Sequence, residues 1–296
     1  MELTTSQVCG RTWSITLPGT TIAYYRLTDH DIILFDSGSL LQGELETWIE
    51  EQGFHVRAIL NSHMHWDHVA ANASLQHTHG ARIYMPVLEA ALKEIEFGRQ
   101  MTCDVEHPYI QQFSEVFRFQ VDEKIGARDE TILVEEVPFQ VIHTPGHSAD
   151  HVAYITPDDV MYAGDTLMTA DMLPGTKFSY AANYALDIES KEKLRAYHCK
   201  AYVMAHCGVT DEIDSLITEN VEYVLQRAQY LWSLIDHPMS MEEIICRVWD
   251  DLHIQDGDLF KVMEIEKIIH NLVVYLMSCG KVEILSRGGI SCYARC

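Results

Sequence analysis

The most informative stretch of this chain is His63-Met64-His65-Trp66-Asp67-His68, which follows the apolar run Ala58-Ile59-Leu60. It holds three imidazoles and a carboxylate, the ligands that borderline divalent metals such as Zn²⁺ prefer. In an extended backbone, the side chains at i, i+2 and i+4 share one face. We therefore expect His63, His65 and Asp67 to face one way and His68 another, which predicts two adjacent metal positions.

Three later segments each bring one more candidate ligand to a turn after an apolar, strand-like run. They are Thr144-Pro145-Gly146-His147-Ser148, Gly164-Asp165-Thr166 and Val203-Met204-Ala205-His206-Cys207-Gly208. Three protein ligands and a shared group for each metal leave room for water, as in catalytic dinuclear sites. A histidine-rich surface loop is the alternative interpretation, but the position of the first motif after a strand-like run favours a metal site.

The series HxHxDH, TPGH, GD and a late His resembles the metallo-β-lactamase-fold hydrolases over roughly residues 10 to 220. Asp36-Ser37-Gly38 also resembles the early Asp-x-Gly turn of that family. The resemblance implies an α/β fold, a four-layer αβ/βα sandwich. It further implies one metal held by His63, His65 and His147, a second held by Asp67, His68 and His206, and Asp165 bridging both together with a water or hydroxide.

We expect two domains, a catalytic domain over residues 1–210 and a small, mainly helical C-terminal module over residues 211–296. A lid-like insertion is expected at about residues 87–120. Within the catalytic domain, the apolar spacing and the turn residues predict helices over Leu45–Gln52, Val69–Gln76, Val87–Glu96 and Pro108–Glu115, and strand-like segments over Ala81–Pro86 and Thr131–His143.

The C-terminal module has helical spacing over Asp211–Ile235 and from about Asp258 to Ser278, with a capping box that starts another helix at Ser240. A hairpin with a Gly288-Gly289 turn is expected at the end of the chain. This order resembles a winged-helix module, like the C-terminal extension of β-lactamase-like hydrolases that include a mitochondrial endoribonuclease. From Pro238 onward there are six basic and nine acidic residues, which disfavours DNA binding. We expect this module to pack on the catalytic domain, border its cleft or form a dimer.

Composition predicts a cytoplasmic enzyme with a small-molecule substrate. The chain has 296 residues, of which 47% are hydrophobic, but no run approaches the roughly 20 apolar residues that span a bilayer. The start Met1-Glu2-Leu3-Thr4-Thr5-Ser6 lacks the features of a secretory signal.

Eight cysteines occur singly, as expected for free thiols, and Cys207 is expected to be a small buried thiol rather than a ligand. The net charge of −23 disfavours nucleic acid as a partner, and a homodimer is a further expectation.

The predicted function is that of a dinuclear metal-dependent hydrolase with two divalent ions, Zn²⁺ first and Fe or Mn²⁺ as alternatives. A bridging hydroxide, acidified by both ions, would attack a small ester, thioester or phosphoester. Asp67 is the predicted catalytic residue, because it would bind a metal and orient the nucleophile. We expect Lys177, Tyr180 and Tyr184, on the loop after Asp165, to lie at the surface.

Departures from relatives of the same fold narrow the substrate. Glyoxalase II proteins continue HxHxDH with Gly-Gly, where this chain has Ala70-Ala71, and the lactonases place a tyrosine shortly after the aspartate, where this chain has Thr166-Leu167-Met168. Asp165 itself argues against true β-lactamases, and a flavodiiron protein would need an appended flavodoxin domain. Two alternatives remain open: a phosphodiesterase or endoribonuclease of the same fold, and an iron-dependent redox or sensor protein.

Eleven further histidines show no ligand spacing. Two of them, His143 and His151, flank His147 closely enough to be candidates for orienting its ring.

Overall fold

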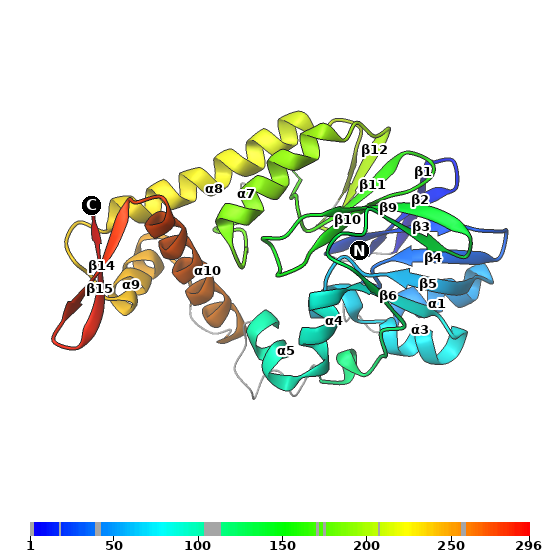
Figure 1. The fold of residues 1–296 in the computed structure, drawn as a ribbon, viewed down its shortest axis with the longest axis horizontal. Helices are drawn as coiled ribbons and strands as arrows, with labels where there is room; N and C mark the ends of the chain where they lie inside the picture. The colour runs from blue at the N-terminus through cyan, green and yellow to red at the C-terminus, as the bar shows by residue number, and fades with distance from the viewer. Residues whose placement is uncertain are drawn as a thin grey trace.

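The computed structural model describes residues 3–17, 19–38, 43–103, 114–169, 172–173, 176–206, 208–255 and 259–296. Two β-sheets pack face to face in the body of the molecule, and a helical module with a small hairpin follows at the C-terminal end (Figure 1). Among the described residues, no helix is both long enough and apolar enough to cross a membrane.

The first sheet has seven strands in the order β1-β2-β3-β4-β5-β6-β7 within the described chain. They are β1 (Thr4–Cys9), β2 (Thr12–Leu17), β3 (Thr20–Arg26), β4 (Asp31–Phe35), β5 (His55–Leu60), β6 (Arg82–Pro86) and β7 (Glu123–Ile125). β1 to β4 pair antiparallel, whereas β4 to β7 pair in parallel. The parallel strands therefore end at the same edge of the sheet, where the first ligand motif begins.

The second sheet has the order β13-β12-β11-β10-β9-β8. Its strands are β8 (Thr131–Val134), β9 (Val137–His143), β10 (Val152–Ile155), β11 (Val160–Gly164), β12 (Ala201–Met204) and β13 (Gly208–Thr210). β11 and β12 are parallel, so the turns that carry Asp165 and His206 leave the sheet side by side.

Helices cover the outer faces of both sheets (Figure 1). The N-terminal part contains α1 (Glu44–Gln52), α2 (Trp66–Val69), α3 (Asn72–His79), α4 (Val87–Glu94), α5 (Glu96–Cys103), η1 (Ser114–Phe117), α7 (Tyr184–Lys193) and η3 (Leu194–Ala196). The C-terminal part contains α8 (Asp214–Leu234), α9 (Met241–Asp251), α10 (Leu259–Ser278), β14 (Val282–Arg287) and β15 (Ile290–Arg295).

A separate hydrophobic core fills the space wherever two layers of the molecule pack against each other. On β4, Ile32 and Leu34 pack with Ile49 of α1, whereas Ile33 and Phe35 point the other way, into the core between the sheets. This alternation follows from the two-residue period of a strand. Further cores lie between the second sheet and α8, and within the C-terminal helices. The predicted α/β four-layer αβ/βα sandwich with a small, mainly helical C-terminal module is therefore confirmed.

The helix predicted over Val69–Gln76 is confirmed in part: α3 begins only at Asn72 and runs to His79, and Val69 ends the separate short helix α2. Ser37 explains the break. Its backbone N–H donates to the carbonyl of His68, and its Oγ accepts from the N–H of Ala71. These two backbone groups would otherwise join a continuous helix.

Other predicted boundaries shifted. The helix expected over Val87–Glu96 ends at Glu94, and α5 begins at Glu96. Most of the helix expected over Pro108–Glu115 lies outside the described residues, as does Cys207. The capping box at Ser240 and the hairpin with its Gly288-Gly289 turn were predicted correctly.

Candidate metal centre

All the candidate ligands lie where strands of the two sheets end. His63, His65, Asp67 and His68 follow β5, His147 follows β9, Asp165 follows β11 and His206 follows β12. Gly164, directly before Asp165, has a φ of +53°, and a Cβ at this position would lie 2.6 Å from Nε2 of His151. Glycine is therefore required at this tight turn.

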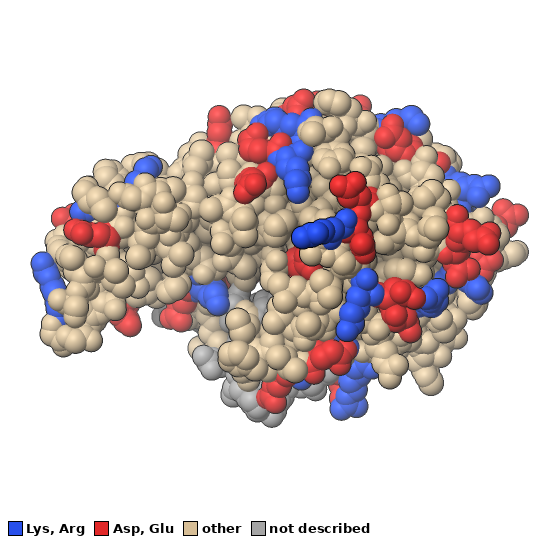
Figure 2. Space-filling view, viewed as in Figure 1, with Lys and Arg blue, Asp and Glu red and all other residues tan. Residues whose placement is uncertain are grey.

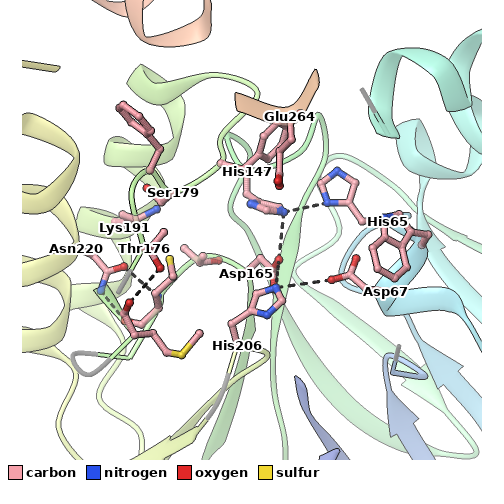
Figure 3. A pocket seen from close by; sticks show the side chains of 16 residues that line it. His65, Asp67, His147, Asp165, Thr176, Ser179, Lys191, His206, Asn220 and Glu264 are labelled. Carbon is pink, nitrogen blue, oxygen red and sulfur yellow. Dashed lines mark hydrogen bonds and ion pairs between the residues drawn. The ribbon is translucent and has the colours of Figure 1, made fainter. Parts of the chain in front are cut away.

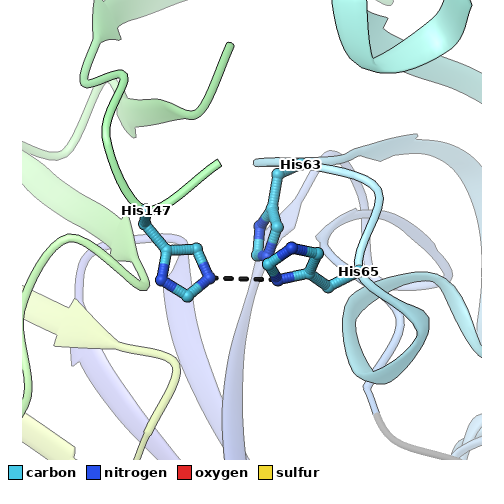
Figure 4. A group of neighbouring side chains, drawn as sticks. All are labelled: His63, His65 and His147. Carbon is cyan, nitrogen blue, oxygen red and sulfur yellow. Dashed lines mark hydrogen bonds between the residues drawn. The ribbon is translucent and has the colours of Figure 1, made fainter. Parts of the chain in front are cut away.

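Three histidines form one cluster of ligand atoms (Figure 4). His63, His65 and His147 offer nitrogens that all lie within 4.8 Å of one another. Nε2 of His147 lies 3.0 Å from Nδ1 of His65. These residues come from opposite sheets, so the two layers of the sandwich meet at this cluster.

A second cluster lies beside the first (Figure 3). Asp67, His68 and His206 again bring their ligand atoms within 4.8 Å of one another. Oδ2 of Asp67 lies 3.7 Å from Nε2 of His68 and 3.8 Å from Nε2 of His206. The extended-backbone expectation that Asp67 shares a face with His63 and His65 was wrong, because α2 begins at Trp66 and the two-residue alternation ends there.

Asp165 lies between the two clusters. Its Oδ2 is 3.2 Å from Nε2 of His147 and 3.1 Å from Nε2 of His206. Its Oδ1 is 3.2 Å from Nε2 of His68, and a third group of ligand atoms joins Asp165 to His63 and His68. One carboxylate thus reaches histidines of both clusters.

Three atoms of this centre are buried and, in the described part of the chain, have no hydrogen-bond partner. They are Nε2 of His63, Nε2 of His68 and Oδ1 of Asp165. The last two lie 3.2 Å apart, within ion-pair distance. Buried polar atoms are normally paired. Because the ligand atoms of these three residues also lie within 4.8 Å of one another, they fit a centre that binds divalent metal ions.

The pKa values of the buried histidines shift in opposite directions in the two clusters. Burial, reinforced by the neighbouring histidines, holds the pKa of His63 well below its usual value. Burial likewise lowers the pKa of His147, although Asp165 partly opposes this effect.

In the second cluster, nearby carboxylates outweigh the effect of burial and raise the pKa of both histidines. Burial opposes a charge on His68, but Asp165, Asp67 and Asp36 together raise its pKa well above the usual value. Asp165 also raises the pKa of His206 to about 9. Burial opposes the charge of Asp165, yet His206, His68 and His147 hold the pKa of this carboxyl well below its usual value. In the metal-free protein near neutral pH, we therefore expect His68 and His206 of the second cluster to be protonated. His63 and His147 of the first cluster should be neutral.

Asp36 is a contributor that the sequence indicated only as part of a turn. It has a φ of 60°, a left-handed conformation that is uncommon outside glycine, and its side chain is fully buried. Oδ2 lies 2.8 Å from Nδ1 of His68 and accepts from Ser62 and Tyr162, each at 2.7 Å. Ser62 in turn lies 2.9 Å from Nδ1 of His63. Asp36 therefore supports ligands of both clusters from behind.

The hypothesis that His151 orients the ring of His147 was wrong. Nδ1 of His151 pairs with Oγ1 of Thr144 at 2.8 Å, and its Nε2 accepts from the N–H of Asp165 at 3.1 Å. Burial lowers the pKa of His151 to about 3, which keeps Nε2 free to accept. His143 pairs with the carbonyl of Asp129. His151 thus positions Asp165 instead.

The centre opens into a cavity of about 290 Å³, lined in part by Trp66, Met168, Phe178 and Tyr180 (Figure 3). The surface positions expected on the loop after Asp165 were wrong for Tyr180 and Tyr184. Tyr180 lies against His65 and His147, with ring centroids 5.7 and 5.5 Å apart. Tyr184 is buried, and Lys177 donates to the carbonyl of Leu252. The chain folds back onto the pocket here because α8 and α10 pack against α7, a contact that local spacing does not reveal.

Comparison with known proteins agrees with this geometry. The sequence profile of the metallo-beta-lactamase superfamily matches residues 16–206. The chain belongs to this superfamily. The resemblance predicted from the ligand motifs is therefore confirmed.

Individual relatives match this chain over only part of its length and of their own. A hydroxyacylglutathione hydrolase of Rhizobium meliloti (strain 1021) is 34% identical over 120 residues, which are 40% of this chain and 37% of that protein. An atrochrysone carboxyl ACP thioesterase of Emericella nidulans is 23% identical over 83% of this chain and 69% of that protein. A hydroxyacylglutathione hydrolase of Bradyrhizobium sp. (strain BTAi1 / ATCC BAA-1182) is 29% identical over 52% of this chain and 49% of that protein. The chain therefore spans less than half the length of these two hydrolases.

Solved structures share the fold over nearly the whole chain. A metallo-beta-lactamase family protein of Thermus thermophilus covers 95% of this chain and 99% of its own, with a TM-score of 0.70 and 18% identity. A beta-lactamase domain protein of Burkholderia ambifaria covers 99% of this chain and 94% of its own, with a TM-score of 0.73 and 16% identity. At these identities the likeness concerns the fold alone.

Proposed function

We propose that this protein is a dinuclear metal-dependent hydrolase that cleaves a small ester or thioester. The observation that carries the proposal concerns His63 Nε2, His68 Nε2 and Asp165 Oδ1, which are buried and have no hydrogen-bond partner in the described part of the chain. The ligand atoms of these three residues lie within 4.8 Å of one another. In this proposal His63, His65 and His147 hold one ion, and Asp67, His68 and His206 hold the other. Asp165 contributes to both.

The bound ions, most readily Zn²⁺ with Fe or Mn²⁺ as alternatives, would supply Lewis acidity toward water and the substrate carbonyl. The protein's own groups do the rest. Asp67 lines the cavity, and its carboxylate would hold an ion and orient the attacking water. Trp66 and Tyr180 line the cavity, and the ring of Tyr180 lies against His65 and His147.

Thioesters and esters are favoured over other substrates by two observations. The relatives include proteins named as a hydroxyacylglutathione hydrolase and an ACP thioesterase, both of which imply thioester cleavage. The cavity wall beyond the ligands is largely apolar, with Met168, Met172 and Phe178, and suits an acyl group. Basic side chains are scattered among acidic ones on the face in Figure 2, so this face offers little support for a polyanionic substrate.

We also propose that residues 211–296 act as a module that completes the pocket, because Asn220 of α8 and Glu264 of α10 line it. The winged-helix likeness, the homodimer and the cytoplasmic location stay predictions.

The test is metal analysis by mass spectrometry on protein purified without added metal, together with a hydrolysis screen. The screen contains thioesters, esters, lactones, phosphodiesters and a β-lactam. We expect two ions per chain and turnover of thioesters or esters. His65→Ala and Asp165→Ala should lose metal and activity, whereas His55→Ala, which alters an exposed histidine of β5, should keep both. Full activity with metal retained in either ligand variant would overturn the assignment.

A further inference from the structure

The C-terminal hairpin leaves one edge strand open. β14 pairs with β15, and β15 is bridged on its other side by Met239. In the described part of the chain, no strand pairs with the outer edge of β14. Figure 1 shows the hairpin at the end of the molecule that lies farthest from the two large sheets. An open edge presents backbone N–H and C=O groups to any strand that can reach it.

The backbone contacts of β15 determine which groups of β14 point outward. The N–H and the C=O of Tyr293 both bond to Met239, at 2.7 and 3.0 Å. Tyr293 lies directly opposite Ile284, so Ile284 turns its own N–H and C=O away from β15. This direction alternates along a strand, so Val282 and Ser286 do the same. Among the described residues, no backbone group bonds to these outward groups.

The side chains of this edge are open to solvent. The exposed residues of β14 are Glu283, Ile284, Ser286 and Arg287. Ile284 is 51% exposed, which is unusual for a large apolar side chain on a strand. Glu283 and Arg287 form no ion pair with any described residue. They stand two positions before and two positions after Leu285, on one face of the strand.

Antiparallel pairing of two β14 strands about a two-fold axis at Leu285 satisfies the backbone and the side chains together. Ile284 of one copy then lies opposite Ser286 of the other, so their outward N–H and C=O groups bond to each other. Glu283 of each copy lies opposite Arg287 of the other, which gives an ion pair on either side of the axis. The same sequence thus supplies both halves of the contact.

Charge selects this register over its neighbours. An axis at Ile284 would place Arg287 opposite Lys281, which are two like charges. An axis at Glu283 or at Arg287 would place that residue opposite its own copy. Charged side chains on an edge strand often prevent pairing, but only where they repel the incoming strand. About Leu285 the opposite charges attract.

The charge of the whole molecule also favours contact at this end. The chain has a net charge of −23, which opposes the approach of two copies. Residues 281–296 reverse this balance, with three basic residues and one acidic residue, namely Lys281, Arg287, Arg295 and Glu283. Contact through the hairpins therefore joins two basic segments that carry one acid each, and it leaves the acidic bodies of the two copies apart.

We propose that two copies of this protein associate through β14, so that the hairpins of both copies form one continuous antiparallel sheet. The inference is independent of the proposed hydrolase function. Each copy has one such edge, so the association closes at a dimer. Ile284 of each copy lies diagonally across from Ile284 of the other, and the two apolar side chains cover each other.

Charge reversal tests the pairing, with the full chain studied by sedimentation equilibrium in about 0.1 M salt. We expect a monomer–dimer equilibrium for the wild type. Glu283→Arg and Arg287→Glu each turn two attractive pairs into two repulsive ones, so each should raise the dimer Kd by about tenfold or more. Glu51→Arg is the matched control, because it makes the same charge change at an exposed position of α1. It should leave Kd unchanged.

Mixing the variants separates a lost contact from lost folding. Glu283→Arg and Arg287→Glu, each weakly associating alone, should form a mixed dimer with each other, because every charge then meets an opposite one. The double variant Glu283→Arg/Arg287→Glu should dimerise as the wild type does. Both recoveries require folded hairpins.

The register has a test of its own. Carbodiimide treatment of Arg287→Lys should give a covalent dimer whose isopeptide bond joins positions 283 and 287 of different copies, as mapped by peptide mass spectrometry. A covalent dimer without this bond would contradict the axis at Leu285.

Three results would overturn the proposal. The first is a wild type that stays monomeric up to about 100 µM, which would leave the edge of β14 to a different partner. The second is a dimer that neither charge reversal weakens, which would place the contact elsewhere. The third is assembly beyond the dimer, because one edge for each copy cannot extend further.

Discussion

Nδ1 of His68 lies 2.8 Å from Oδ2 of Asp36. This contact joins residues 63–68, which carry four of the candidate metal ligands, to the end of β4. A carboxylate on the inner nitrogen fixes the ring, so that Nε2 of His68 points at Asp165. Asp36 has no place in the ligand clusters, yet the geometry of the second cluster depends on it.

Asp36→Asn should weaken metal binding without unfolding the protein. Asparagine tolerates the left-handed backbone at this position, but its amide cannot accept from Ser62, Tyr162 and His68 together. We expect the affinity for the more weakly bound ion to fall by about 10- to 100-fold, as measured by competition with a chromophoric chelator. Asp29→Asn, at an exposed bend, is the control. Unchanged affinity in Asp36→Asn would show that Asp36 does not orient His68.

The two ions should bind with different pH dependence. His63 and His147 have pKa values well below the usual range and are neutral near pH 7, so the first cluster releases few protons on binding. The pKa of His206 is raised to about 9 and that of His68 is also raised, so an ion must displace protons from the second cluster. Affinity for this ion should therefore fall as the pH drops below about 9.

Equilibrium dialysis checks this expectation. Close to one ion per chain should remain at about pH 6 and two at about pH 8.5. Titration calorimetry in buffers of different ionisation enthalpy should show greater proton release for the second ion. Equal stoichiometry and equal proton release at both pH values would contradict the difference between the clusters.

Glu89 of α4 holds two ligand loops together and should matter for stability. Its buried carboxylate accepts from the N–H of Met64 at 3.2 Å, from Oγ of Ser148 at 2.8 Å and from the N–H of Asp150 at 2.9 Å. Glu89→Gln turns an NH₂ group toward one of these donors. We expect a loss of about 1–3 kcal/mol in the free energy of unfolding, measured with urea on the metal-free protein.

Glu50→Gln on α1 is the control for Glu89. Glu50 is exposed, so its replacement should change stability by less than about 0.5 kcal/mol. Similar losses in both variants would mean that Glu89 has no special role in joining the loops.

The sequence predicted the parts of the site that depend on local pattern. The apolar runs that end at Leu60, Gly164 and Met204 are strands, and the turns that follow carry the candidate ligands. Strand ends can be read this way because a buried strand needs a continuous apolar run and a turn needs glycine or a short polar residue.

The rest depends on contacts between residues far apart in the chain. Asp36 meets Tyr162 across 126 positions, and Glu89 meets Asp150 across 61. No spacing within one segment reveals such pairs. The same limit explains the wrong surface position for Tyr180, because the C-terminal helices that enclose its loop come much later in the sequence.

The side chain of Asn220 connects the C-terminal module to the pocket wall, and we expect its removal to weaken substrate binding. From α8, its Oδ1 accepts from the N–H of Met168 at 2.9 Å, and its Nδ2 donates to the carbonyl of Met168 at 2.8 Å. Because Met168 and Asn220 both line the cavity, Asn220→Ala should cost about 1–3 kcal/mol of stability and loosen this wall. We expect KM for the cleaved ester or thioester to rise more than kcat falls, while metal content stays the same. Gln226→Ala, an exposed position on α8, should leave stability and KM unchanged. A loss of metal from Asn220→Ala would instead indicate that this contact supports Asp165 rather than the substrate wall.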